Sequence, residues 1–149
     1  MSILVDTNVL LRRTQPAHPQ HTAAIGAVKG LLDDRVPLYF TMQNMTEFWN
    51  VATRPAASNG LGFSIRLTID QIELIESVME LLPDASEIYE EWKRLVVRHE
   101  VRGVQVHDTK LVAAMNVHGI RQLLTFNVQD FVRFGIDVLN PATLTRDSE

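Results

Sequence analysis

The chain has 149 residues, 46% of them hydrophobic, a formal net charge of −4 and an isoelectric point near 5.7. That length and hydrophobic content suit one compact domain with a well-formed core. The negative charge argues against a protein that holds nucleic acid by bulk positive charge. It does not exclude a nuclease, because divalent cations bound by clustered carboxylates reverse the local sign. The absence of cysteine excludes disulfides, thiolate metal sites and cysteine nucleophiles.

Targeting signals are also lacking in the sequence. No apolar run is long enough to span a bilayer, and no basic segment leads from Met1 into a signal-like stretch. We therefore expect a cytoplasmic protein with no membrane partner. A single domain is predicted over residues 1–144, followed by a disordered tail at 145–149.

Apolar segments that suggest strands alternate with segments that suggest helices. The run Ile3-Leu4-Val5 has no polar alternation, which is typical of a strand buried on both faces. Further strands are predicted at 37–41, 81–83, 122–125 and 137–141. Helical spacing of apolar residues predicts helices at 9–13, 20–33, around 45–52, 85–99 and 127–134. A further helix is expected to begin at a cap formed by Thr68 or Asp70, and another to begin at Asp108 and end at Gly119. This alternation predicts an α/β fold with a mainly parallel sheet sandwiched between helices.

Four acidic residues occupy comparable places, just after a strand or early in a helix. They are Asp6, Glu47, Asp108 and Asp130. In a sheet with right-handed crossovers, the strand-to-helix junctions fall on one edge, so these carboxylates are expected to converge. Oxygen ligands of this kind suit Mg²⁺, which can activate water against a phosphodiester.

Each acid also has a structural explanation that involves no chemistry. Asp6 and Asp108 are placed to cap helices or to favour a helix dipole, and Glu47 fits an exposed helix position. Asn127 and Asp130 fit a cap and a first-turn acid. The joint pattern therefore carries the functional hypothesis, rather than any one residue.

Other catalytic signatures are missing. The five histidines show no His-x-His or His-Glu-x-x-His spacing, which disfavours a zinc hydrolase. No Gly-x-Ser-x-Gly elbow and no phosphate-binding loop ending in Lys-Ser/Thr occurs, which argues against an α/β-hydrolase and a P-loop nucleotidase.

Four motifs, spread over residues 3 to 131, resemble those of the PIN-domain ribonucleases, and in particular the toxins of VapBC-type toxin–antitoxin pairs. The motifs are Val5-Asp6-Thr7-Asn8, Asn44-Met45-Thr46-Glu47-Phe48, the segment opening with Asp108-Thr109-Lys110-Leu111, and Leu124-Thr125-Phe126-Asn127-Val128-Gln129-Asp130-Phe131. Their order and spacing are more specific than any one of them.

The resemblance implies a three-layer α/β/α fold and an endoribonuclease that depends on Mg²⁺ or Mn²⁺. It implies that Asp6, Glu47 and Asp108 carry the metal and that Thr125 positions a ligand or water, with Asn8 in a supporting role. The family usually has an aspartate where Asn127 stands. An asparagine offers a carbonyl oxygen without charge, so Asp130 is assigned the fourth acidic role. By analogy, a cognate antitoxin and a second copy of the chain are expected partners.

The hypothesis is metal-assisted hydrolysis of RNA, with Glu47 as either a ligand or a base for the attacking water. Flanking phosphates would be held by basic residues, for which the candidates are Arg12, Arg13, Lys110 and Arg54. One alternative is a non-catalytic PIN-like module that binds RNA or protein. A second is a phosphotransfer protein with Asp6 as nucleophile, although the haloacid-dehalogenase type needs a second aspartate where Asn8 stands.

Overall fold

The computed structural model of the protein describes residues 1–144, so the expected tail at 145–149 lies outside the described residues. Five strands form one sheet in the order β3-β2-β1-β4-β5, and every neighbouring pair is parallel. The strands are β1 (Ile3–Val5), β2 (Leu38–Thr41), β3 (Glu80–Leu82), β4 (Gln122–Leu124) and β5 (Asp137–Leu139). The predicted parallel α/β fold is confirmed.

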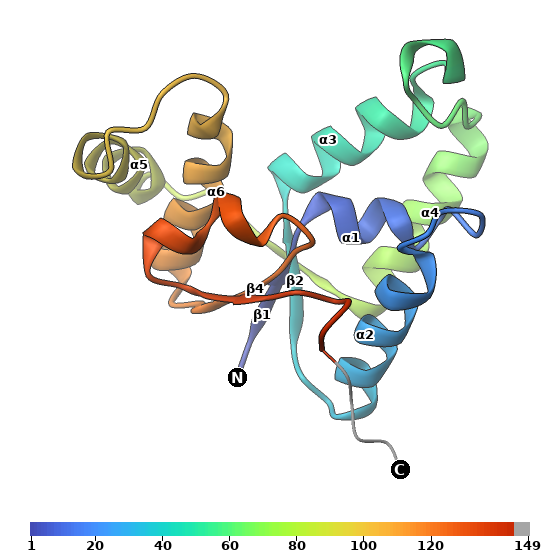
Figure 1. Ribbon diagram of the computed structural model, residues 1–149, viewed down its shortest axis with the longest axis horizontal. Helices are drawn as coiled ribbons and strands as arrows, with labels where there is room; N and C mark the ends of the chain where they lie inside the picture. The colour runs from blue at the N-terminus through green and yellow to red at the C-terminus, as the bar shows by residue number, and fades with distance from the viewer. Residues whose placement is uncertain (145–149) are drawn as a thin grey trace.

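Helices cover both faces of the sheet (Figure 1). The α-helices are α1 (Thr7–Arg12), α2 (His21–Asp33), α3 (Met42–Thr53), α4 (Ile65–Val78), α5 (Glu87–Arg98) and α6 (Gln105–His118). Three 3₁₀ turns complete the described elements: η1 (Ala56–Ser58), η2 (Val128–Asp130) and η3 (Val132–Phe134). None of the helices within residues 1–144 is long and apolar enough to cross a membrane.

The central strand β1 contributes to two separate cores because its side chains alternate between the faces of the sheet. Ile3 and Val5 pack into the core beneath α1, α2 and α3, whereas Leu4 packs into the core beneath α5 and α6. All three side chains are fully buried. The uninterrupted apolar run is therefore explained by a strand with helices on both sides.

Three local predictions need correction. Helix α4 is capped by Ser64, whose hydroxyl accepts from the Leu67 amide, and Thr68 is instead buried within the helix. Helix α6 begins three residues before Asp108, because Gln105 already has helical geometry. The segment predicted as a helix at 127–134 forms the two 3₁₀ turns η2 and η3, since the chain turns toward β5 within a few residues.

Candidate active site

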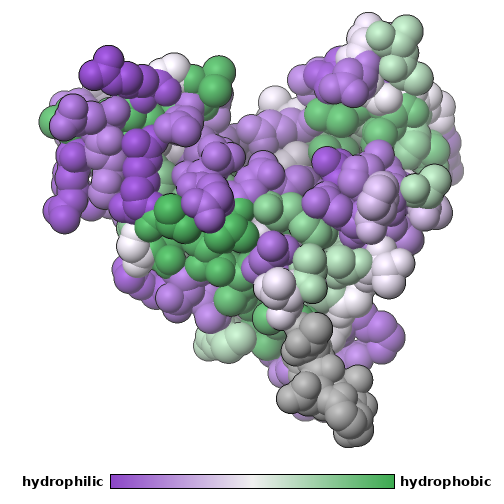
Figure 2. Space-filling model, viewed as in Figure 1, coloured by the Kyte–Doolittle hydropathy of each residue, from purple (hydrophilic) through white to green (hydrophobic). Residues whose placement is uncertain are grey.

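The four acids Asp6, Glu47, Asp108 and Asp130 all lie near the carboxyl edge of the sheet. Asp6 directly follows β1, and the α3 helix that carries Glu47 directly follows β2. Asp108 is in the first turn of α6, and Asp130 ends η2 beyond β4. The space-filling view shows a hollow between the lobe of α5 and α6 and the lobe of α3 and α4, lined at its base by hydrophilic residues (Figure 2). This edge is where open α/β sheets bind ligands.

Asp6 accepts three hydrogen bonds and is the most buried of the acids. It is the N-cap of α1, and its Oδ1 accepts a 2.8 Å hydrogen bond from the Thr7 amide. Its Oδ2 accepts from the Thr125 hydroxyl at 2.8 Å and from the Asn8 side-chain amide at 3.4 Å. The side chain is only 8% exposed. The capping role considered from the sequence is therefore real, and it fixes the carboxylate at the end of the central strand.

Thr125 connects this carboxylate to the loop after β4. Its hydroxyl donates to Asp6 and accepts from the Asn8 amide and from the Asn127 backbone amide, both at 3.0 Å. The Asn8 side-chain oxygen in turn accepts from the Phe126 amide at 3.1 Å. These bonds join the first and last parts of the domain at one point and hold the segment leading to Asp130.

Glu47 is positioned by residues that the sequence interpretation did not assign to the site. The Gln43 side-chain amide donates to Glu47 Oε2 at 3.4 Å, and Thr7 and Asn44 act on Oε1. The Thr7 hydroxyl donates to Glu47 Oε1 at 2.7 Å and accepts from the Asn44 side-chain amide at 3.0 Å. The Asn44 side-chain oxygen accepts from the amide of Thr41 at 2.8 Å and from its hydroxyl at 3.0 Å. The sequence feature that could have identified Asn44 is the Thr41-x-x-Asn44 capping box, which places a buried side-chain amide one turn before Glu47.

The charges of the four carboxylates affect the pKa values of two of them, Asp6 and Asp108. Burial raises the pKa of Asp6 to about 6, against the hydrogen bonds from Thr125 and Thr7, and the charges of Glu47 and Asp130 raise it further. Burial likewise raises the pKa of Asp108 to about 7, and the charges of Asp6, Asp130 and Glu47 add to this effect. Both shifts have the direction expected for acids that share a partly desolvated site.

No cation of the described part of the chain balances this negative charge. None of the ion pairs formed within residues 1–144 involves any of the four acids. A divalent cation would supply the missing charge, and carboxylate oxygens are the ligands that Mg²⁺ prefers. The donor chemistry therefore fits such an ion, although no three Asp, Glu or His side chains of residues 1–144 are arranged around one common point.

The fourth position differs from the other three. Asp130 is exposed, and its influence on the site is through its charge. The Asn127 side chain is also exposed, and only its backbone amide is seen to bond to the site, through Thr125. The structure thus brings Asp130 close enough to couple with Asp6 and Asp108 while leaving Asn127 at the rim.

The basic residues expected to hold phosphates lie in different surroundings. Arg12 bonds to Gln15 and Gln20 at the far end of α1, next to Arg13. Arg54 donates to the Asn59 carbonyl in the loop before α4. Lys110 lines a cavity with Tyr89 and Trp92 on the α5 side of α6. None of the four forms an ion pair with a site acid in the described residues.

The PIN-domain family matches residues 3–136, and the chain belongs to this family. Solved structures with the same fold include toxins of bacterial toxin–antitoxin pairs, all at low sequence identity. VapC20 of Mycobacterium tuberculosis, described as a toxin that cleaves the sarcin–ricin loop, is 21% identical with a TM-score of 0.67, over 91% of this chain and 96% of that one.

Two further structures are toxin–antitoxin complexes. VapBC2 of Rickettsia felis, bound to a DNA fragment from its promoter, gives a TM-score of 0.70 at 12% identity, over 94% of this chain and 98% of that one. A toxin–antitoxin complex of Klebsiella pneumoniae gives a TM-score of 0.63 at 19% identity, over 94% of this chain and 98% of that one. A comparison with curated protein sequences found no match. These likenesses show the fold alone.

Proposed function

We propose that the protein is a Mg²⁺- or Mn²⁺-dependent endoribonuclease and acts in the cytoplasm as the toxin of a type II toxin–antitoxin pair. The observation that carries the proposal is the buried carboxylate of Asp6, held at the centre of a sheet edge near three further acids, none of which forms an ion pair within residues 1–144. An acidic site of this kind, in a PIN domain, suits hydrolysis of a phosphodiester.

In this proposal Asp6, Glu47 and Asp108 hold the metal, which when bound lowers the pKa of a water and offsets charge on the phosphoryl oxygens. Thr125 and Asn8 keep the Asp6 carboxylate oriented. Thr7 holds Glu47 through a 2.7 Å hydrogen bond, so the carboxylate faces the site either as a ligand or as the base for water. Asp130 supplies the fourth negative charge from η2.

The decisive experiment compares the wild type with Asp6→Asn in RNA cleavage with Mg²⁺, with Mn²⁺ and with EDTA. Asparagine preserves the size of the side chain and an acceptor oxygen, so the fold is expected to persist, as circular dichroism would verify. Cleavage should require the metal and fall by at least about a hundredfold in the variant, because one charged ligand is lost. Inducible expression should arrest growth with the wild type only. Undiminished cleavage by Asp6→Asn would overturn the assignment.

A non-catalytic PIN-like module that binds RNA or protein is the second candidate. It is favoured by the uncharged Asn127 and by the absence, within residues 1–144, of three acids already gathered around one point. Isothermal titration with Mn²⁺ separates the candidates. Binding that disappears in Asp6→Asn supports the nuclease, whereas no binding at millimolar ion supports the module.

The proposed partners are an RNA substrate, a cognate antitoxin and a second copy of the chain. Solved structures of the same fold include complexes with antitoxins. Exposed apolar side chains on α4, among them Ile65, Leu67 and Leu74, offer a surface for a protein partner. Co-expression with the product of a small neighbouring gene, followed by relief of growth arrest and co-purification, tests the antitoxin.

A further inference from the structure

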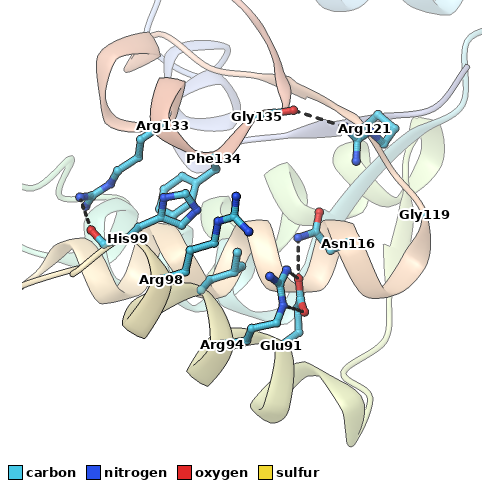
Figure 3. Close-up of a pocket in the computed structure, with 11 residues that line it drawn as sticks. Glu91, Arg94, Arg98, His99, Asn116, Gly119, Arg121, Arg133, Phe134 and Gly135 are labelled. Carbon is cyan, nitrogen blue, oxygen red and sulfur yellow. Dashed lines mark hydrogen bonds and ion pairs between the residues drawn. The ribbon is translucent and has the colours of Figure 1, made fainter.

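A pocket lined by four arginines lies on the lobe of α5 and α6, outside the acidic site (Figure 3). Its volume is about 490 Å³, which is large enough for a nucleotide, since small-molecule pockets span roughly 300–1,000 Å³. The arginines come from three separate parts of the chain. They are Arg94 and Arg98 of α5, Arg121 before β4, and Arg133 of η3, and together they are called the arginine pocket below.

The pocket is strongly positive although the whole chain is negative. Glu91, which pairs with Arg94 at 2.7 Å, is the one acid among the lining residues. The positive field is also felt by His99, whose pKa is lowered by burial and then by Arg98, Arg133 and Arg94. Four guanidinium groups and one carboxylate leave a net charge of +3 on this surface, with His99 neutral. A cavity with this charge concentrates anions.

The protein itself satisfies only part of this positive charge. Arg121 and Arg133 donate to the backbone carbonyls of Gly135 and His99, at 3.3 and 3.2 Å, which orients both guanidinium groups without neutralising them. Arg98 forms no hydrogen bond or ion pair with any residue of the described chain, and its side chain extends from α5 into the pocket (Figure 3). Oriented arginines without carboxylate partners are suited to phosphate, which accepts two parallel hydrogen bonds from one guanidinium.

One rim of the pocket is linked directly to the acidic site. Arg133 is three residues beyond Asp130 and also hydrogen-bonds to the side chain of Gln105. Gln105 and Asp108 are three residues apart in α6, which places them on the same face of the helix. Arg133 is therefore connected through Gln105 to the helix that carries Asp108.

We propose that the arginine pocket binds a backbone phosphate of single-stranded RNA that extends beyond the acidic site. The inference rests on the proposed ribonuclease function, for which it supplies a binding site remote from the reacting phosphate. Arg98 is the side chain expected to contribute most, because it has no competing hydrogen-bond or ion-pair partner among residues 1–144. Arg133 is the pocket residue that also bonds to α6, the helix that carries Asp108.

The test measures RNA binding without catalysis. Asp6→Asn protein in EDTA is titrated with a labelled single-stranded RNA of about a dozen nucleotides, and the dissociation constant is followed against salt. Adding Arg98→Gln should weaken binding about tenfold, and it should reduce the slope of log K against log salt by about 0.7, as expected for one lost phosphate contact on a single strand. Arg35→Gln is the matched control, since Arg35 is exposed and lies outside the pocket, and it should change neither quantity.

Further measurements fix the interpretation. Thermal unfolding should change little in Arg98→Gln, because the Arg98 side chain makes no hydrogen bond or ion pair within residues 1–144. In the active protein this variant should raise KM for long RNA with little change in kcat. A mononucleotide can be added as a competitor of RNA. If it displaces RNA from the arginine pocket at concentrations that leave RNA binding at the rest of the surface unchanged, the pocket binds free nucleotides and the RNA proposal is overturned. Unchanged affinity and salt slope in Arg98→Gln would also overturn it. The binding result does not depend on cleavage, so either proposal can fail alone.

Discussion

Asp6 is both a helix cap and a candidate metal ligand, and its two oxygens have different partners. Oδ1 accepts one amide hydrogen bond from Thr7, whereas Oδ2 accepts from Thr125 and Asn8. A carboxylate oxygen can accept two hydrogen bonds, so Oδ1 retains one lone pair that no donor within residues 1–144 uses. The capping role therefore orients the carboxylate and leaves Oδ1 able to accept a further ligand.

Replacing Thr125 by valine should disrupt this orientation. The change preserves the shape of the side chain but leaves Asp6 Oδ2 and the Asn127 amide without the hydroxyl that joins them. We expect a loss of about 1–3 kcal/mol in the free energy of unfolding, measured by urea titration. Metal-dependent cleavage should fall by about ten- to a hundredfold, the usual effect of removing a residue that orients a metal ligand.

Thr125→Ser is the matched control for this experiment. Serine retains the hydroxyl and loses only a methyl group, so cleavage should stay within a few-fold of the wild type. If serine and valine impair cleavage equally, the hydroxyl is not the important group.

Asp108 should make the stability of the metal-free protein depend on pH. Its pKa is raised from an ordinary 3.8 to about 7, chiefly by burial. Between these values the folded protein binds more protons than the unfolded chain, so its stability falls as the pH rises from about 4 to about 7 and then levels off. Asp108→Asn should therefore be more stable than the wild type at pH 7.5 in EDTA, with the difference disappearing near pH 4.

The measurement for Asp108 is thermal unfolding across this pH range. Addition of Mg²⁺ should reduce the advantage of Asp108→Asn at pH 7.5, because a bound cation stabilises the ionised wild-type carboxylate. An equal stability difference at both pH values would show that the effect is not one of ionisation.

At the scale of elements, the start of α3 links the sheet to Glu47. The Thr41 hydroxyl caps the helix by accepting from the Asn44 amide, and the Asn44 side chain accepts from the Thr41 backbone in return. Because Asn44 also bonds to Thr7, the same cap fixes the residue that holds Glu47. Helix initiation and site geometry therefore depend on one buried side chain.

Asn44→Ala should lower the free energy of unfolding by about 2 kcal/mol, since a buried capping group and its partners lose their hydrogen bonds. Cleavage per folded molecule should fall as well, because Thr7 is released. Thr46→Ala on the same helix serves as the control. Thr46 is exposed, so its loss should change the stability by no more than about 0.5 kcal/mol. Chemical denaturation of both variants measures the two losses in the free energy of unfolding. A large loss for Asn44→Ala alone supports a specific role for Asn44, whereas equal losses would show that any substitution in α3 destabilises the protein.

At the scale of the whole molecule, the short central strand joins the two halves of the domain. β1 pairs with both β2 and β4, and its side chains enter both cores. The carboxyl end of this strand carries Asp6, so the site is attached to the most buried part of the fold. This placement explains how a strand of three residues holds a charged group steadily.

Shortening a side chain of the central strand should therefore reduce the free energy of unfolding much more than shortening a side chain of an edge strand. Leu4→Ala leaves a cavity beneath α5 and α6 and should cost about 2–5 kcal/mol. Leu81→Ala in the edge strand β3, where the side chain is 50% exposed, should cost less than about 1 kcal/mol. Urea unfolding midpoints measure both, and similar losses would argue against the central role of β1.

Much of the fold follows from local sequence. The apolar runs at Ile3–Val5 and Leu38–Thr41 locate strands, and their lack of alternation indicates a sheet covered on both sides. Two helix starts were predicted too late in the chain. Ser64 caps α4 through a local hydrogen bond from the Leu67 amide, and Gln105 begins α6 three residues before Asp108. The spacing of apolar residues does not reveal either boundary.

The sequence by itself determined the parallel α/β architecture, and it predicted that the four acids would lie at one edge of the sheet, since strand order along the chain dictates where strand ends meet. Only the tertiary structure decided which side chains hold them: Thr7 and Asn44 behind Glu47, and Thr125 behind Asp6, are joined by hydrogen bonds across 37 to 119 residues. It alone also brought together the arginine pocket, because its members are adjacent only after α5, β4 and η3 have packed. Such contacts arise from packing, and the periodicity of apolar residues along the chain does not predict them.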